Sequence, residues 1–399
     1  MDADEHAPGP PLPRVSILCH DLSTNALGRS LLLAELLDGL TEVEIAGVHS
    51  GPDLWAPARG HPVPIRVGPR VEDSTGLALA RAWLADLPLG DVLLVSKPMP
   101  TSLGLVRSTT LSRTVAVALD IDDWEYGLCR ATPRPLAHAL ALAAGPLIRQ
   151  RPNHVARIRR LERHVAAIPH RLVSNAWLRD RFGGTVLYHV RDPEQLDPAR
   201  VDRRAARAGL ELDERVWVGF VGTYRPHKGV DDLVAALAAI EGDRAPGLLL
   251  VGMDTESREV RTLLTSAAAQ LGAERLRVTG TVPLADLPAH VCAADIIAIP
   301  SKRSRASAGQ IPAKLFDAMA LARPVVATAV NDVPDILAGC GRVVAPGEVW
   351  ALTRAIEELA TDPEQRARLG AAARARLCSH YSYRQGRAVL AEFLRGLGR

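Results

Sequence analysis

Short, almost wholly apolar runs alternate along this chain with longer segments in which apolar residues recur every three or four positions. Runs of the first kind are typical of strands buried on both faces of a parallel sheet, and segments of the second kind are typical of helices covering it. In the first half, the predicted strands are 15–19, 43–48, 92–96, 114–119, 172–174 and 186–188, and the predicted helices are 27–40, 76–84 and 101–107. In the second half, the predicted strands are 216–222, 247–252, 276–280, 295–300, 324–330 and 341–344, and the predicted helices are 230–240, 256–271, 287–294 and 312–322.

This alternation predicts an α/β protein made of two Rossmann-like, doubly wound domains that face a central cleft. We expect a flexible tail over 1–13, an N-terminal domain over 14–190, a linker over 191–213 and a C-terminal domain over 214–380. A last helix, within 381–399, is expected to pack back on the first domain. Ligands of such sheets bind at the carboxyl ends of the strands, so the polar residues that follow each strand are the candidates for function.

Composition narrows the functional classes. The chain has 399 residues, of which 47% are hydrophobic and 23% charged, and its formal net charge is only +3. That charge is too small to indicate a nucleic-acid partner. The five cysteines are scattered and lack CxxC spacing, so disulfides and zinc sites are not expected. The start is acidic and proline-rich, unlike a signal peptide, and no apolar run reaches the length of a membrane span. We therefore expect a soluble cytoplasmic protein.

The stretch 219–229, GFVGTYRPHKG, has the features of a phosphate site. A buried strand runs into a glycine turn at Gly222 and Thr223, and a helix is expected to begin near Gly229. Arg225 and Lys228 add positive charge where a helix N-terminus already favours anions. The glycine spacing fits neither a Walker loop nor a GxGxxG fingerprint. The alternative is that these cations are solvated turn charges.

A second stretch, 311–330, places Pro312, Lys314, Leu315 and Asp317 at the start of a short helix before a buried strand. Together the two stretches resemble the donor half of retaining, family 4 glycosyltransferases of the GT-B fold. In that family a Lys-Gly pair holds the donor diphosphate and a later carboxylate holds the ribose; here these positions are Lys228-Gly229 and Asp317. The resemblance implies transfer of a hexose from a UDP- or GDP-linked sugar, with retention and with no metal or other cofactor. Backbone amides near Lys314 and Leu315 would face the phosphate.

Two positions depart from the family pattern. Thr223 stands where many relatives carry arginine, and Arg225 is the expected substitute. Gly309 stands where the first of two family glutamates would contact the donor sugar, so Gln310 in the polar loop 301–310 becomes the candidate for that contact. Strand-end residues that would frame the base are Gly252, Met253 and Thr281.

The acceptor half offers polar residues after three strands. The acceptor-binding candidates are Asn25, Gly28, Lys97, Asp120 and Trp124. The catalytic candidates are Asp120, Asp122 and His20, as a general base or a stabiliser of charge, beside Arg225 and Lys228 on the donor side. The acidic run 120–125 is similar to the DxD metal motif of the other glycosyltransferase architecture, but GT-B proteins normally work without a metal. His20 has a competing interpretation as a structural residue.

Residues 149–171 contain seven arginines and one glutamate. They indicate either a solvated helical face or a surface for an anionic membrane or a phosphorylated acceptor. The partners expected are a nucleotide sugar and a small-molecule or lipid-linked acceptor; homodimer formation stays open. Two other functional classes also stay open: a GT-B sugar-nucleotide epimerase or phosphorylase, and a non-catalytic nucleotide-sugar binding protein, which Gly309 favours.

Overall fold

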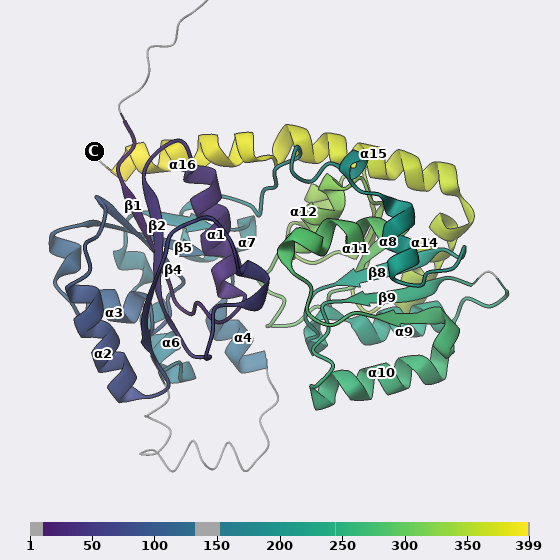
Figure 1. Cartoon of the computed structure of the whole chain (residues 1–399), viewed down its shortest axis with the longest axis horizontal. Helices are drawn as coiled ribbons and strands as arrows, with labels where there is room; N and C mark the ends of the chain where they lie inside the picture. Colours follow the sequence, from purple (N-terminus) through teal and green to yellow (C-terminus); the bar gives the residue numbers. More distant parts are fainter. Residues whose placement is uncertain (1–10, 132–151, 244, 398–399) are drawn as a thin grey trace, which may run out of the picture.

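Two parallel sheets lie side by side in the computed structural model, which describes residues 11–131, 152–243 and 245–397 (Figure 1). The first sheet has strand order β3-β2-β1-β4-β5-β6-β7, and the second has β10-β9-β8-β11-β12-β13. In each sheet the order reverses beside the first strand, at β1/β4 and at β8/β11, which is the point where ligands of doubly wound sheets bind. The predicted fold class, two Rossmann-like halves, is confirmed.

The first half consists of β1 (Val15–Cys19), α1 (Ala26–Leu37), β2 (Val43–His49), β3 (Ile65–Arg70), α2 (Ser74–Ala85), β4 (Val92–Ser96), α3 (Leu103–Arg107), β5 (Ala116–Ile121), α4 (Glu125–Ala131), α6 (Val155–Glu162), β6 (Arg171–Val173), α7 (Ala176–Phe182) and β7 (Thr185–Val186). Two hydrophobic clusters cover the two faces of its sheet. β3 was not predicted, because its sequence IRVGPR contains a Gly-Pro pair and exposed arginines, features that an edge strand tolerates.

The second half consists of α8 (Arg203–Gly209), β8 (Trp217–Val221), α9 (Val230–Ala238), β9 (Gly247–Val251), α10 (Arg258–Leu271), β10 (Leu276–Val278), α11 (Leu287–Ala293), β11 (Ile296–Ile299), α12 (Ala313–Ala320), β12 (Val325–Thr328), α13 (Val333–Ile336), β13 (Arg342–Val344), α14 (Val349–Thr361) and α15 (Pro363–His380). Two further clusters pack on its sheet. The segment predicted to be a linker is more structured than its composition indicates, because α8 lies in it and packs on α11.

The chain crosses between the halves twice. The first crossing passes through Arg191, and the second joins α15 to α16 (Tyr383–Leu397), which run end to end along one side of both halves (Figure 1). The main chains of the two crossings pair: Arg191 N–H donates to the Tyr381 oxygen, and Tyr383 N–H donates to the Arg191 oxygen, both at 2.9 Å. α16 packs against α1, and Leu390 and Leu394 enter the core of the first half.

Two sequence predictions fall partly outside the described residues. The expected flexible tail includes residues 1–10, and the arginine-rich segment includes residues 149–151, none of which the structure describes. The rest of that segment contains α6, which buries Ile158 and exposes Arg159 and Arg160. Membrane contact through this face stays a prediction. None of the helices in the described part of the chain is both long and apolar enough to span a membrane.

Candidate functional site

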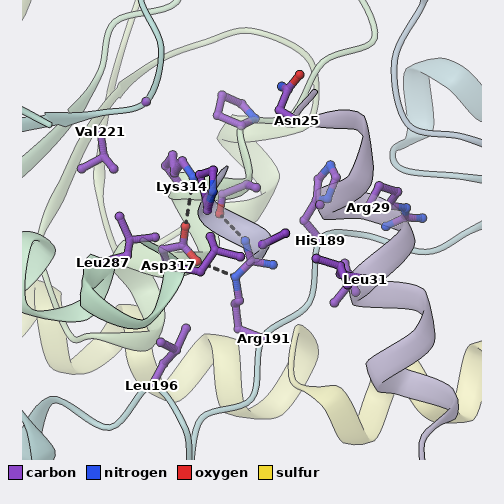
Figure 2. A pocket seen from close by; sticks show the side chains of 18 of the residues that line it. Asn25, Arg29, Leu31, His189, Arg191, Leu196, Val221, Leu287, Lys314 and Asp317 are labelled. Atoms are coloured by element: carbon purple, nitrogen blue, oxygen red, sulfur yellow. Dashed lines mark hydrogen bonds and ion pairs between the residues drawn. The ribbon is translucent and has the colours of Figure 1, made fainter. Parts of the chain in front are cut away.

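A cavity of about 1450 Å³ lies between the two halves and is lined by residues of both. Figure 2 shows Arg29 of α1 and Asn25, the residue before that helix, on one side, Lys314 and Asp317 of α12 on the other, and Arg191 between them. The volume exceeds that of a typical small-molecule pocket, about 300–1,000 Å³, and is large enough for two substrates. Predicted site residues that line it are Asn25, Gly28, Asp122, Gly222, Thr223, Lys228, Gly252, Thr281, Gln310, Lys314 and Asp317.

Two lysines meet at the glycine turn after β8. Gly222 has φ +129°, and a Cβ added there would lie 3.8 Å from both Lys228 Nζ and Lys314 Cε. Lys228 Nζ donates to the main-chain oxygen of Thr223 at 2.8 Å and to its Oγ1 at 3.2 Å. Burial, together with the charges of Lys314 and Arg225, lowers the pKa of Lys228 to about 8. Lysines crowded together in this way form a site that an anion would stabilise.

Asp317 stands beside this pair with one oxygen unused. Its side chain is 5% exposed, Oδ1 accepts from Arg191 Nε at 2.5 Å, and Lys314 Nζ lies 3.9 Å from Oδ2 (Figure 2). Oδ2 is buried and accepts no hydrogen bond from the described residues. A buried carboxylate oxygen without a donor is rare, so this oxygen is suited to a ligand hydroxyl. The basic turn and the acidic helix position therefore converge on one cavity, as the two sequence stretches predict.

The opposite wall, at the end of β5, is acidic. Lys97 Nζ lies 3.1 Å from Asp122 Oδ1, 2.9 Å from Asp123 Oδ2 and 2.6 Å from Glu125 Oε1. Lys97 itself has φ +61°, a conformation that is strained for a residue with a side chain. Asp122 and Asp123 line the cavity, whereas Lys97 lies behind them and is not among the lining residues. Within residues 11–131, 152–243 and 245–397, no group of three or more His, Cys, Asp or Glu is placed to hold a metal ion.

Asp120, which the sequence predicts to act in the site, does not line the cavity. The predicted strand ended at 119, but β5 continues to Ile121, so Asp120 is a strand residue in register with Ser96 and Leu172. It is fully buried, and both its oxygens accept from the Arg29 guanidinium at 2.9–3.3 Å. Its role in this structure is to fix α1 against the sheet.

Five other candidates do not line the cavity. Trp124 packs against Trp177 and donates to Glu162 at 3.0 Å, away from the acceptor wall. His20 is buried, and burial followed by the charge of Lys97 lowers its pKa to about 3, so it is a poor general base. Met253 and Leu315 are core residues, and Leu315 N–H donates to the Pro312 oxygen instead of facing the cavity. Arg225 is exposed and donates to Tyr224, so in this structure it does not replace the family arginine.

The position of the missing glutamate has no room for a side chain. Gly309 has φ +73°, and a Cβ there would approach the Trp177 ring to 2.7 Å. Asn175 Nδ2 donates to the Gly309 oxygen at 2.8 Å. The neighbouring Gln310 donates to Asp123 Oδ1 at 3.0 Å, so it bridges the two halves at the cavity.

Several cavity residues escaped the sequence reasoning. Arg191 lies in the predicted linker and follows no predicted strand. His189 directly follows the predicted strand 186–188 but is not among the sequence candidates. Asp123 lay inside the acidic run but was not chosen over its neighbours. Burial, followed by the charges of Arg29 and Arg191, holds the pKa of His189 well below its ordinary value. For Arg191, the only signal in the sequence is that an aspartate follows it near the domain boundary. Such Arg-Asp pairs are too common to identify a site residue.

The half of the chain that carries Lys228 and Asp317 is similar to proteins of a known family. Residues 215–362 match the family model described as glycosyl transferases group 1. The second half is therefore similar to the group 1 glycosyltransferases. The prediction made from the two sequence stretches is thus confirmed for the half that contains Lys228 and Asp317.

Curated relatives extend the match. A GDP-mannose-dependent alpha-(1-6)-phosphatidylinositol monomannoside mannosyltransferase of Mycolicibacterium smegmatis is 31% identical over 51% of this chain and 54% of its own length. A 2-deoxystreptamine glucosyltransferase of Streptomyces kanamyceticus is 29% identical over 43% of this chain and 44% of its own. The chain thus spans about half the length of these relatives. They agree with the prediction of a glycosyltransferase.

Solved structures resemble nearly the whole length of this chain. Sucrose-phosphate synthase from Thermosynechococcus elongatus superposes with TM-score 0.73 at 17% identity, over 96% of this chain and 99% of that one. Anabaena HepE, solved with UDP-glucose, gives TM-score 0.74 at 16% identity, over 96% and 100%. At this identity the likeness shows the fold alone, which is GT-B, as predicted.

Proposed function

We propose that this protein transfers a hexose from a UDP- or GDP-linked sugar to a small polar acceptor, with retention of configuration and without a metal. The observation that carries the proposal is the convergence of Lys228, Lys314 and the free oxygen of Asp317 on one cavity between the halves. Two ammonium groups match a diphosphate, and a carboxylate oxygen that accepts no hydrogen bond matches a ribose hydroxyl. The group 1 relatives that name a GDP-mannose donor support the same choice of substrate.

In the reaction, the bond between the sugar C1 and the phosphate oxygen breaks, and a bond from C1 to the acceptor oxygen forms on the same face. Lys228 and Lys314 stabilise the negative charge that builds on the departing diphosphate. The proton of the acceptor hydroxyl passes to the oxygen of that phosphate, so no protein nucleophile is required. Asp122 and Asp123, on the facing wall, orient the acceptor and stabilise positive charge on the sugar ring.

A nucleotide screen tests the proposal. Melting curves with UDP, GDP, TDP and ADP should show a rise for one nucleotide, because a ligand that binds only the folded state adds roughly 2.7 kcal/mol at 100 times its Kd. The corresponding nucleotide sugar should then be consumed, and mass spectrometry should find a hexose added to an acceptor. No rise with any of the four nucleotides would contradict the proposal.

One observation favours a second function. Gly309 provides no carboxylate for the donor sugar and has no space for one. The second function is therefore that of a protein that binds nucleotide sugars without transferring them. Binding with neither transfer nor hydrolysis, over a broad acceptor panel, supports this function against the first. An epimerase would instead release free sugar from the nucleotide sugar alone.

A further inference from the structure

The acceptor wall of the cavity carries excess negative charge. Around Lys97, three carboxylates share one ammonium group at ion-pair distances of 2.6–3.1 Å. Asp122 and Asp123 present this excess to the cavity. Glu35, Asp38 and Glu42, from α1 and the residues after it, line the same cavity.

Nearby cations do not cancel this charge. Arg29 is engaged by the buried Asp120, and Arg191 by Asp317. Arg59 pairs with Asp53. Arg387, which donates to the main-chain oxygen of Glu35, and Arg200 also line the cavity and offset only part of the charge of Glu35, Asp38 and Glu42. His189, which also lines the cavity, is held neutral, since burial lowers its pKa. Lys228 and Lys314 face the cavity from the donor wall, where the diphosphate would occupy them.

Asp122 has unused capacity for hydrogen bonds. The residue is only 8% exposed, yet its buried Oδ1 accepts no hydrogen bond from any described residue. Lys97 Nζ is 3.1 Å from Oδ1, near enough for an ion pair but not aligned to donate. A buried carboxylate can only accept, so the group that completes it must be a donor, and its charge favours a cationic donor.

We propose that the acceptor carries a protonated amine, which Asp122 receives, beside the hydroxyl that is glycosylated; the acceptor class is an aminocyclitol or amino sugar. This inference rests on the proposed transferase function and specifies its second substrate. An acceptor bearing phosphate at this position would face Asp122 and Asp123 at close range and would be repelled. The same wall that attracts the amine thus discriminates against phosphorylated acceptors.

The test compares acceptors of one ring skeleton. Streptamine, its di-N-acetyl derivative, scyllo-inositol and an inositol monophosphate differ in charge at the amine positions. Affinity is measured by calorimetry on the full chain saturated with the nucleoside diphosphate found in the screen, and transfer by mass spectrometry. We expect streptamine to bind at least tenfold more tightly than scyllo-inositol or the N-acetyl derivative, with the phosphate weakest.

Asp122→Asn supplies the matched variant. The near-isosteric change keeps shape and removes charge, so the preference for streptamine should fall to within about twofold, with the nucleotide affinity unchanged. Equal binding of the four compounds by the wild-type protein overturns the inference without any need for the variant, and so does a preference for the phosphate. In both cases the proposed transferase function still holds if the protein binds and turns over the donor. Failure to bind any nucleotide refutes that function and, with it, the inference about the acceptor.

Discussion

Replacement of Lys228 by methionine tests whether this lysine binds the diphosphate or only stabilises the fold. Lys228 forms two hydrogen bonds, both to Thr223, and no ion pair with any carboxylate in the described residues. We expect Lys228→Met to weaken nucleoside diphosphate binding strongly while leaving the stability of the fold nearly unchanged.

The stability change follows from two opposing contributions. A fall of the Lys228 pKa from 10.5 to about 8 corresponds to roughly 3 kcal/mol at about 1.4 kcal/mol per pKa unit. Since the ammonium keeps partial contact with water, we take about half of that as the gain on removing it. Loss of the two hydrogen bonds costs about 1 kcal/mol each. The sum lies within about 1 kcal/mol of zero, so the melting temperature should move by less than about 4 °C.

The binding change is larger. A charged hydrogen bond to phosphate contributes roughly 1.5–3 kcal/mol, so the Kd for the nucleoside diphosphate should rise about 10- to 100-fold. Calorimetric titration measures the Kd, and thermal unfolding without ligand measures the stability. Lys302→Met is the control, because Lys302 pairs with Asp231 and Asp232 and does not line the cavity. A Lys228→Met protein with a Kd within twofold of the wild type would refute the assignment of the diphosphate site, as would an equal loss in the control.

Three further predictions follow from the same geometry. The pKa of Lys228 is depressed to about 8 and the bound diphosphate favours the charged form, so nucleotide affinity should fall as pH rises through 8. Binding enthalpies measured at pH 8 in buffers of different ionisation enthalpy should reveal proton uptake on binding. Zero proton uptake would contradict this prediction. Lys97→Met leaves three nearly buried carboxylates without their cation and should cost roughly 3–5 kcal/mol of unfolding free energy in urea titrations; a loss below 1 kcal/mol means that the cluster is well solvated. Gly222→Ala introduces a side chain at φ +129° but meets no atom closer than 3.8 Å, so chemical denaturation should show a loss of roughly 1–3 kcal/mol from backbone strain alone; unchanged stability would show that the turn relaxes.

The sequence predicts those strands and helices that show a continuous apolar run or a helical repeat of apolar residues. Strands buried on both faces, such as β4 and β8, appear in the sequence as apolar runs. The turn after β8 combines glycines with cations, and that combination predicts a phosphate site. β3 was missed because an edge strand needs no such run. α8 was missed because its polar composition, Arg203 to Gly209, looks like a linker, although it packs on α11.

The acceptor side of the site was harder to predict, since strand ends decide which polar residue faces the cavity. A boundary error of two residues at β5 placed Asp120 in a loop, whereas it is a buried partner of Arg29. The signal that could have excluded it, an arginine on α1 facing the same sheet, requires knowledge of the packing. Arg191 was out of reach for the same reason, because it enters the site through the crossing between the halves and not through a strand end.

The pairing of the two crossings at Arg191 has a mechanical consequence. Tyr381 and Tyr383 bracket the Arg191 backbone, and its side chain grips Asp317. Any rotation of one half against the other must therefore pivot near this residue, and displacement must grow with distance from it. The pivot lies at the wall of the cavity itself, so a ribose hydroxyl bound to Oδ2 of Asp317 would lie beside the point about which the two halves turn.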